Sequence, residues 1–161
     1  MEIRRLTPGH DAALAALIRA NLKAHGLDIP GTVYFDAGLD HLSEFYSADP
    51  ARRAYFVLME GERLVGGIGL AEIDLFEDCA ELQKLYLDDS VKGRGLGYRL
   101  IEQVEGAARA LGYERMYLET HTNLQAAIHI YEKSGYVEID KPEAVVHATM
   151  NRFYLKELAT K

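Results

Sequence analysis

The segment from residue 80 to 111 constrains the fold more than any other part of the chain. Its first residues, AELQKLYL, read as a strand, and the turn Lys92-Gly93-Arg94-Gly95-Leu96-Gly97 leads into an amphipathic helix. The first N–H groups of a helix have no partner within it, and the helix dipole adds partial positive charge there. A strand, a glycine turn and a helix in this order therefore predict a binding site for an anionic phosphate group.

Composition narrows the class of protein. The chain has 161 residues and 48% hydrophobic residues, which predicts one domain over residues 1–161 with one core. The net charge of −7, without lysine- or arginine-rich runs, argues against a nucleic acid partner. No apolar run is long enough to span a membrane, and the N-terminal MEIRRLTP reads as a strand and not as a signal peptide.

The single cysteine, Cys79, excludes an internal disulfide and a cysteine-based zinc cluster. The histidines are too scattered to predict a metal site. We therefore expect no metal and a reducing, cytoplasmic location.

Hydrophobic spacing and turn residues predict an antiparallel first half and a β-α-β-α-β-β second half, which is a mixed α/β (α+β) domain. The glycine-rich run at residues 65–69 suggests a bulge or a close backbone approach. We expect strands at residues 2–6, 55–60, 63–73, 80–87, 114–120, 136–139 and 147–155, and helices at 8–26, 39–46, 95–111 and 123–134, the last of them capped by Asn123.

Three kinds of phosphate-binding loop compete for the glycine turn. A nucleoside-triphosphate loop needs Gly-x-x-x-x-Gly-Lys-Ser/Thr, which the chain lacks. A dinucleotide loop needs Gly-x-Gly-x-x-Gly; Gly93 and Gly95 match, but Tyr98 occupies the last position. Glu119 stands roughly where that fold places its ribose-binding acid, yet too little chain follows Gly97 to build the fold.

The third pattern, Gln/Arg-x-x-Gly-x-Gly/Ala, fits residues 92–97, with Lys92 where Gln or Arg is usual. These residues resemble the acetyl-CoA pyrophosphate loop of the GNAT superfamily of N-acetyltransferases. Residues 81–87 are similar to the strand before that loop, and the segment after the next strand is similar at Asn123, Ala126, Tyr131, Gly135 and Tyr136. The resemblance implies a mixed, mostly antiparallel seven-stranded sheet with a splayed central parallel pair, flanked by about four helices.

The glycine turn would hold the cofactor through N–H groups from Arg94 to Tyr98, which would face the pyrophosphate of acetyl-CoA. The resemblance implies a bulge in the preceding strand that points a backbone N–H at the thioester, and a strand edge that pairs with the pantetheine arm. The expected cofactor-binding residues are Leu85, Tyr86, Leu87, Lys92, Gly93, Arg94, Gly95, Leu96, Gly97, Tyr98 and Asn123.

Acetyl transfer to an amine also needs a base for the amine and an acid for the departing thiolate. Tyr131 lies eight residues after Asn123, where the family places a tyrosine near the cofactor sulfur, so we expect it to be the acid. Glu81 is the candidate base, because it has the separation from the loop seen in histone-acetylating members. A water chain without a single base is the alternative.

The acceptor is not named by the sequence. Seven acidic residues against one lysine lie between Ala71 and Ser90, which favours a cationic amine if part of the cluster lines the acceptor side. Residues 26–46 would form the acceptor wall. We expect an N-acetyltransferase that acts on a primary amine of a small molecule or peptide. The alternatives are a catalytically silent acyl-CoA-binding sensor and, against the net charge, a toxin that acetylates charged tRNA. A homodimer through the strand at 147–155 is an expectation by analogy.

Overall fold

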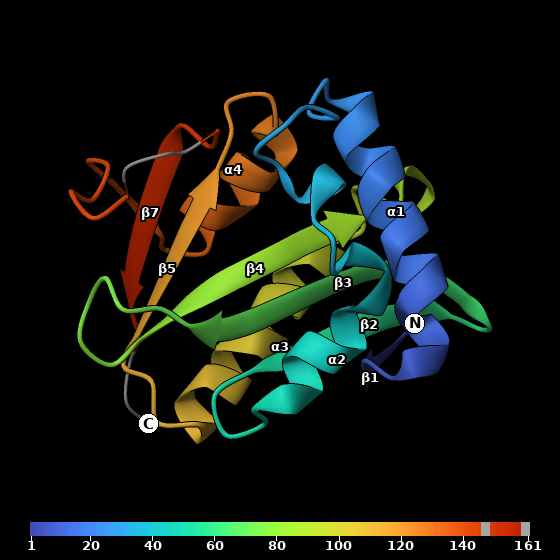
Figure 1. The fold of residues 1–161 in the computed structure, drawn as a ribbon, viewed down its shortest axis with the longest axis horizontal. Helices are drawn as coiled ribbons and strands as arrows, with labels where there is room; N and C mark the ends of the chain where they lie inside the picture. Colours follow the sequence, from blue (N-terminus) through green and yellow to red (C-terminus); the bar gives the residue numbers. More distant parts are fainter. Residues whose placement is uncertain (146–148, 159–161) are drawn as a thin grey trace.

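The structure is a computed structural model that describes residues 1–145 and 149–158. Seven strands form one mixed sheet in the order β1-β2-β3-β4-β5-β7-β6 (Figure 1). Of the described pairs, β4 and β5 are parallel and the others antiparallel. The strands are β1 (Glu2–Arg5), β2 (Ala54–Glu60), β3 (Arg63–Glu72), β4 (Cys79–Leu87), β5 (Arg115–Thr120), β6 (Val137–Ile139) and β7 (Arg152–Glu157).

Four α-helices cover the sheet: α1 (Asp11–Ala24), α2 (Leu42–Ala48), α3 (Leu96–Ala110) and α4 (Gln125–Lys133). On one face α1 and α2 form a cluster with Tyr55, Val57 and Met59 of β2, while α3 and α4 join the cluster on the other face. Strand β2 is apolar on both sides because both of its faces are covered. The predicted fold, including the parallel pair and the four helices, is confirmed.

The parallel pair separates soon after it forms. Strands β4 and β5 are in register only at Cys79–Arg115, Ala80–Met116 and Glu81–Tyr117. Both strands continue beyond this point, β4 to Leu87 and β5 to Thr120. Among the described residues, the edge of β4 that faces β5 therefore has no strand partner after Glu81. Figure 1 shows the two strands spreading apart, with α1 and α4 on either side of the gap.

Some element boundaries differ from the prediction. Helix α4 begins at Gln125 and not at Asn123, and its first position has no side-chain cap, so the predicted Asn123 cap is wrong. Strand β7 runs over Arg152–Glu157 and not from residue 147 to 155. Its start is set by pairing with β5, where Arg152 lies opposite Thr120, and not by its own apolar pattern. Residues 147 and 148 of the predicted strand lie outside the described residues.

The predicted irregularity at the glycine-rich run is confirmed, because the register between β3 and β4 shifts between Gly67 and Gly69. Among the helices that the structure describes, none combines the length and the apolar character needed to cross a membrane.

Candidate active site

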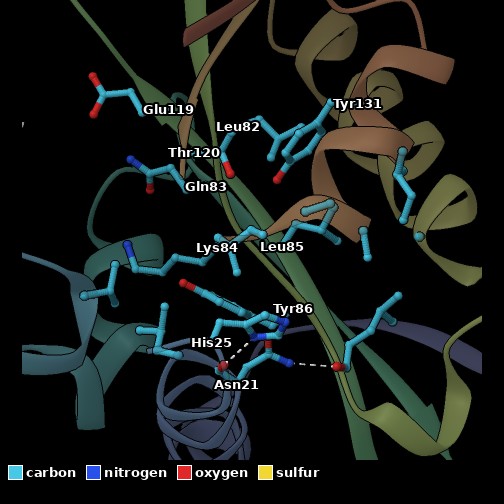
Figure 2. A pocket seen from close by; sticks show the side chains of 18 of the residues that line it. Asn21, His25, Leu82, Gln83, Lys84, Leu85, Tyr86, Glu119, Thr120 and Tyr131 are labelled. Carbon is cyan, nitrogen blue, oxygen red and sulfur yellow. Dashed lines mark hydrogen bonds between the residues drawn. The ribbon is translucent and has the colours of Figure 1, made fainter. Parts of the chain in front are cut away.

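The separation of β4 from β5 opens a cavity of about 700 Å³. Its walls come from the C-terminal half of α1, the segment after it, β4 beyond Ala80, the glycine turn, the end of β5, and α4. Figure 2 shows Tyr131 on one side of this cavity and Gln83, Lys84 and Glu119 on the other. The cavity thus joins the predicted phosphate loop to both predicted catalytic residues.

The glycine turn has the backbone conformation that phosphate binding requires. Gly93 and Gly95 have φ values of +79° and +73°, and a Cβ atom at either would meet nothing within 4 Å. Helix α3 begins directly after Gly95 and has no side-chain cap, so its first N–H groups have no partner within the helix. Of the residues predicted in this turn, Lys92, Gly93, Gly95, Leu96, Gly97 and Tyr98 line the cavity.

Two predicted cofactor-binding residues are not brought to the cavity wall. The Arg94 guanidinium lies 3.5 Å from the Glu60 carboxylate, across the β2–β3 hairpin. The Asn123 side chain donates from Nδ2 to the carbonyl oxygen of His25 at 2.9 Å, which ties the start of α4 to the end of α1. Asn123 therefore supports the frame of the cavity, and its neighbour Leu124 lines it.

Strand β4 carries a bulge at the cavity wall. Gln83 pairs with Gly69 and Tyr86 with Gly67, so Lys84 and Leu85 together oppose the single residue Ile68. Lys84 has φ of +54°, which is unusual for a residue with a side chain. The bulge lies at Lys84–Leu85, at the start of the predicted stretch from Leu85 to Leu87, and all of these residues line the cavity.

The Glu81 carboxylate is held by a chain of neutral groups. Gln83 donates from Nε2 to Glu81 at 2.6 Å, and the Tyr46 hydroxyl donates to Gln83 Oε1 at 2.7 Å. Burial raises the pKa of Glu81, the nearby charge of Glu119 adds to that rise, and the Gln83 hydrogen bond opposes it. A carboxylate with a raised pKa in a cavity has the properties of a general base.

Glu119 is the second carboxylate of the cavity and comes from the end of β5. The Tyr117 hydroxyl donates to its Oε2 at 2.8 Å. Among the described residues, no Lys, Arg or His nitrogen lies within 4 Å of the carboxylates of Glu81 or Glu119.

Lys84 supplies the positive charge on the same side of the cavity. Its side chain lies near the charges of Asp36 and Glu81, and its Nζ is 6.0 Å from the Tyr46 ring centroid. Burial lowers the pKa of Lys84, and these two carboxylates oppose that change. A smaller hollow along α2 shares Asp36, Gln83 and Lys84 with the main cavity, so the cavity has a side branch at this point.

Tyr131 is buried in the α4 wall, packed edge-on against Tyr136 with ring centroids 6.0 Å apart. Its hydroxyl points into the cavity (Figure 2), and no described residue forms a hydrogen bond with it. Burial raises the pKa of Tyr131 well above its usual range, which favours the protonated phenol. A protonated donor aimed into a cavity suits the role of a general acid.

The predicted acidic cluster does not gather in one place. Glu72 pairs with Arg53, Asp88 bonds Ser90, and Asp89 pairs with Lys92. Of the seven acids between residues 71 and 90, Glu81 lines the cavity. Asp36 and Glu119, which were not predicted for the acceptor side, line it as well.

Sequence reasoning also missed Asn21, Gln83 and Lys84. Asn21 donates from Nδ2 to the Leu87 carbonyl at 2.8 Å and so holds α1 against the end of β4 (Figure 2). Gln83 and Lys84 share a strand with Glu81, which was a usable signal for their presence near the cavity. Within residues 1–145 and 149–158, no group of three or more His, Cys, Asp or Glu side chains is placed to hold a metal ion.

Comparison with known sequences identifies relatives over most of the chain. The sequence model of the "Acetyltransferase (GNAT) family" matches residues 21–136. The uncharacterized N-acetyltransferase YjgM of Escherichia coli K12 is 39% identical over 140 residues, which is 86% of this chain and 83% of the relative. The spermidine N(1)-acetyltransferase of Vibrio cholerae is 29% identical over 103 residues, 62% of this chain and 59% of that enzyme.

Solved structures share the fold over nearly the whole chain. A GNAT-family acetyltransferase from Staphylococcus aureus Mu50 superposes with a TM-score of 0.85 at 20% identity, covering 98% of this chain and 99% of the other. The PaiA N-acetyltransferase of Thermoplasma acidophilum, solved with coenzyme A, superposes with a TM-score of 0.77 at 21% identity, over 97% and 98% of the two chains.

Proposed function

Because the chain belongs to the GNAT acetyltransferase family, we propose that it transfers an acetyl group from acetyl-CoA to a primary amine of a small molecule or peptide. One observation carries the proposal. One cavity is lined by the glycine turn, by β4 from Glu81 to Leu87, and by Tyr131 and Glu119. Direct transfer needs both substrates side by side, and this cavity has a place for each.

The residues present fit acetyl-CoA, which supplies an activated acyl thioester. Gly93 and Gly95 leave open space at the start of α3, where free N–H groups would hold the diphosphate with Lys92 beside them. The β4 edge from Leu85 to Leu87 has no strand partner on the β5 side and would pair with the pantetheine amides. The bulge at Lys84–Leu85 provides backbone donors for the thioester oxygen.

Proton movements are assigned to Glu81 and Tyr131. Glu81 takes a proton from the ammonium form of the acceptor, directly or through water, which leaves the neutral amine that attacks. As the C–S bond breaks, Tyr131 gives its proton to the departing sulfur, and the second proton of the attacking nitrogen leaves through water, which restores the phenol. Both side chains line the same cavity.

The acceptor is proposed to be a cationic amine. Asp36, Glu81 and Glu119 outnumber Lys84 on this side of the cavity, which attracts positive charge. The relative from V. cholerae is named for spermidine, and a solved neighbour at 17% identity is an aminoglycoside 6′-N-acetyltransferase with coenzyme A. Both names support an amine acceptor. A cytoplasmic location and a homodimer remain predictions.

The test is incubation with acetyl-CoA and a panel of amines, followed by measurement of free thiol. We expect thiol release that depends on a primary amine and is greater for polyamines and aminoglycosides than for anionic amino sugars. Saturable acetyl-CoA binding without thiol release for any amine would contradict the proposal and favour the silent sensor.

The glycine turn gives a separate prediction for cofactor binding. Gly95→Val is expected to weaken coenzyme A binding, measured by calorimetry, by about tenfold or more, because a β-branched residue is strained at φ of +73°. Gly106→Ala is the matched control on the same helix, since a Cβ there meets nothing within 4 Å and the position lies outside the cavity. Equal affinity of the Gly95→Val variant and the wild type would remove the turn from the binding site.

A further inference from the structure

Tyr55 makes a contact that crosses a whole strand. It belongs to β2, and its hydroxyl donates to the backbone carbonyl of Lys84 on β4 at 2.7 Å. Strand β3 lies between the two in the sheet. The ring is fully buried and therefore spans β3 on the face covered by α1 and α2.

Two glycines of β3 make room for that ring. A Cβ atom at Gly67 would stand 2.5 Å from the Tyr55 hydroxyl oxygen, and one at Gly69 would stand 2.4 Å from Tyr55 Cδ2. Any side chain at either position would displace the ring. The glycine-rich run, which is unusual for a strand, therefore leaves the space in which the Tyr55 side chain crosses β3 to reach the Lys84 carbonyl.

The bonded carbonyl belongs to the bulge. In a regular ladder, strand carbonyls bond to the neighbouring strand, whereas the Lys84 carbonyl bonds to a side chain. Lys84 has φ of +54° and, with Leu85, has no register partner on β3. The Tyr55 hydroxyl therefore holds the one part of β4 that departs from the ladder.

A planar trans peptide couples this carbonyl to the next donor. The Lys84 C=O and the Leu85 N–H belong to one peptide group and point in opposite directions. A hydrogen bond that holds the Lys84 carbonyl toward Tyr55 therefore turns the Leu85 N–H away from Tyr55. Leu85 lines the cavity and packs with the cluster on the opposite face of the sheet from Tyr55.

We propose that Tyr55 is a positioning residue that fixes the Lys84–Leu85 peptide so that the Leu85 N–H faces the thioester oxygen of bound acetyl-CoA. The proposal rests on the proposed function. It assigns a catalytic consequence to a buried tyrosine that touches neither substrate. Burial also raises the pKa of Tyr55 well above its usual range, which keeps its hydroxyl protonated and able to donate.

The test is Tyr55→Phe, which removes the hydroxyl and keeps the ring in place over Gly67 and Gly69. Loss of one oxyanion donor lowers kcat by about 10²- to 10³-fold. In the Tyr55→Phe variant the donor remains but its orientation is less fixed, so kcat should fall by about tenfold. We expect that loss with acetyl-CoA affinity within about twofold of the wild type, and faster amide hydrogen exchange in residues 82–87. Tyr113→Phe is the matched control, because Tyr113 also donates to a backbone carbonyl, that of Arg52 at 2.8 Å, outside the cavity.

A second variant separates positioning from general packing. Asn adopts positive φ more readily than Lys, so Lys84→Asn should hold the bulge with less help from Tyr55. We expect the kcat loss caused by Tyr55→Phe to shrink from about tenfold to about threefold in the Lys84→Asn background. An equal loss in both backgrounds would assign Tyr55 to packing alone and overturn the proposal.

Thiol release by the wild type is measured first, since its absence for every amine overturns the proposed function itself. With that release present, wild-type kcat and unchanged hydrogen exchange in the Tyr55→Phe variant overturn the present proposal and leave the proposed function standing.

Discussion

Replacing Tyr131 with Phe is expected to lower kcat for acetyl transfer by about 10²-fold, the lower end of what a positioned proton donor contributes. The ring remains in the α4 wall, so the cavity keeps its shape, and only the hydroxyl that points into it is lost. Acetyl-CoA affinity should stay within about twofold of the wild type. Single-turnover measurements with saturating amine would report the chemical step directly.

The control for this prediction is Tyr136→Phe. Tyr136 packs against Tyr131 and is equally buried, but its hydroxyl donates to Glu105 at 3.0 Å, outside the cavity. That variant should lower Tm while kcat is retained. Because the raised pKa keeps Tyr131 protonated, the wild-type rate should show no alkaline decline from this residue up to about pH 10, the ordinary phenol pKa. A Tyr131→Phe variant with wild-type single-turnover rate would end the assignment of Tyr131 as the acid.

Replacing Glu81 with Gln is expected to lower kcat/KM at pH 7 by about 10²-fold. The wild-type kcat/KM should rise with pH as Glu81 ionises, and burial places that rise above the ordinary carboxylate range. In the Glu81→Gln variant this rise should vanish, and the rate should follow the free-amine fraction up to the amine pKa near about 10. The difference between the two enzymes should therefore narrow as the pH increases.

Glu77→Gln provides the control, since it removes the same charge from an exposed residue outside the cavity.

Glu81 also has a predictable effect on stability. Its pKa is raised in the folded chain, so folding is favoured below the unfolded pKa of about 4.5 and this advantage is lost as pH rises through the folded pKa. The Glu81→Gln variant should therefore have a higher Tm at pH 7. For catalysis, parallel pH profiles of kcat/KM for the wild type and the Glu81→Gln variant would instead indicate that the amine loses its proton through water without Glu81.

Much of the fold was predictable because its causes are local. Glycines with positive φ are needed at residues 93 and 95, and the amphipathic spacing after them indicates α3. The mixed seven-stranded sheet with its central parallel pair followed from the family resemblance, and the structure confirms it. Glu81 was predicted from its separation from the glycine turn and Tyr131 from its spacing after Asn123, both through the family resemblance, and both residues line the cavity.

The sequence did not predict contacts between segments that are far apart along the chain. Asn123 was predicted to cap α4, a local role, but its side chain bonds the carbonyl of His25, which is 98 residues away in the sequence. Arg94 was predicted to bind the phosphate; its side chain lies beside Glu60 at the end of β2 and does not line the cavity, so that role stays a prediction. Glu119 and Asp36 reach the cavity only because β5 separates from β4 and the segment after α1 folds over the gap.

Local patterns in the chain were enough to specify the glycine turn and the succession of strands and helices along the chain, because backbone conformation and hydrophobic spacing depend on neighbouring residues. Which polar groups meet depends on how distant segments pack. Tyr55 and Lys84 are 29 residues apart and lie on strands separated by β3, so no local pattern pairs them. Which group a buried polar side chain bonds depends on the segments packed around it. The hydrogen bond that holds the bulge in β4 is a contact of this kind.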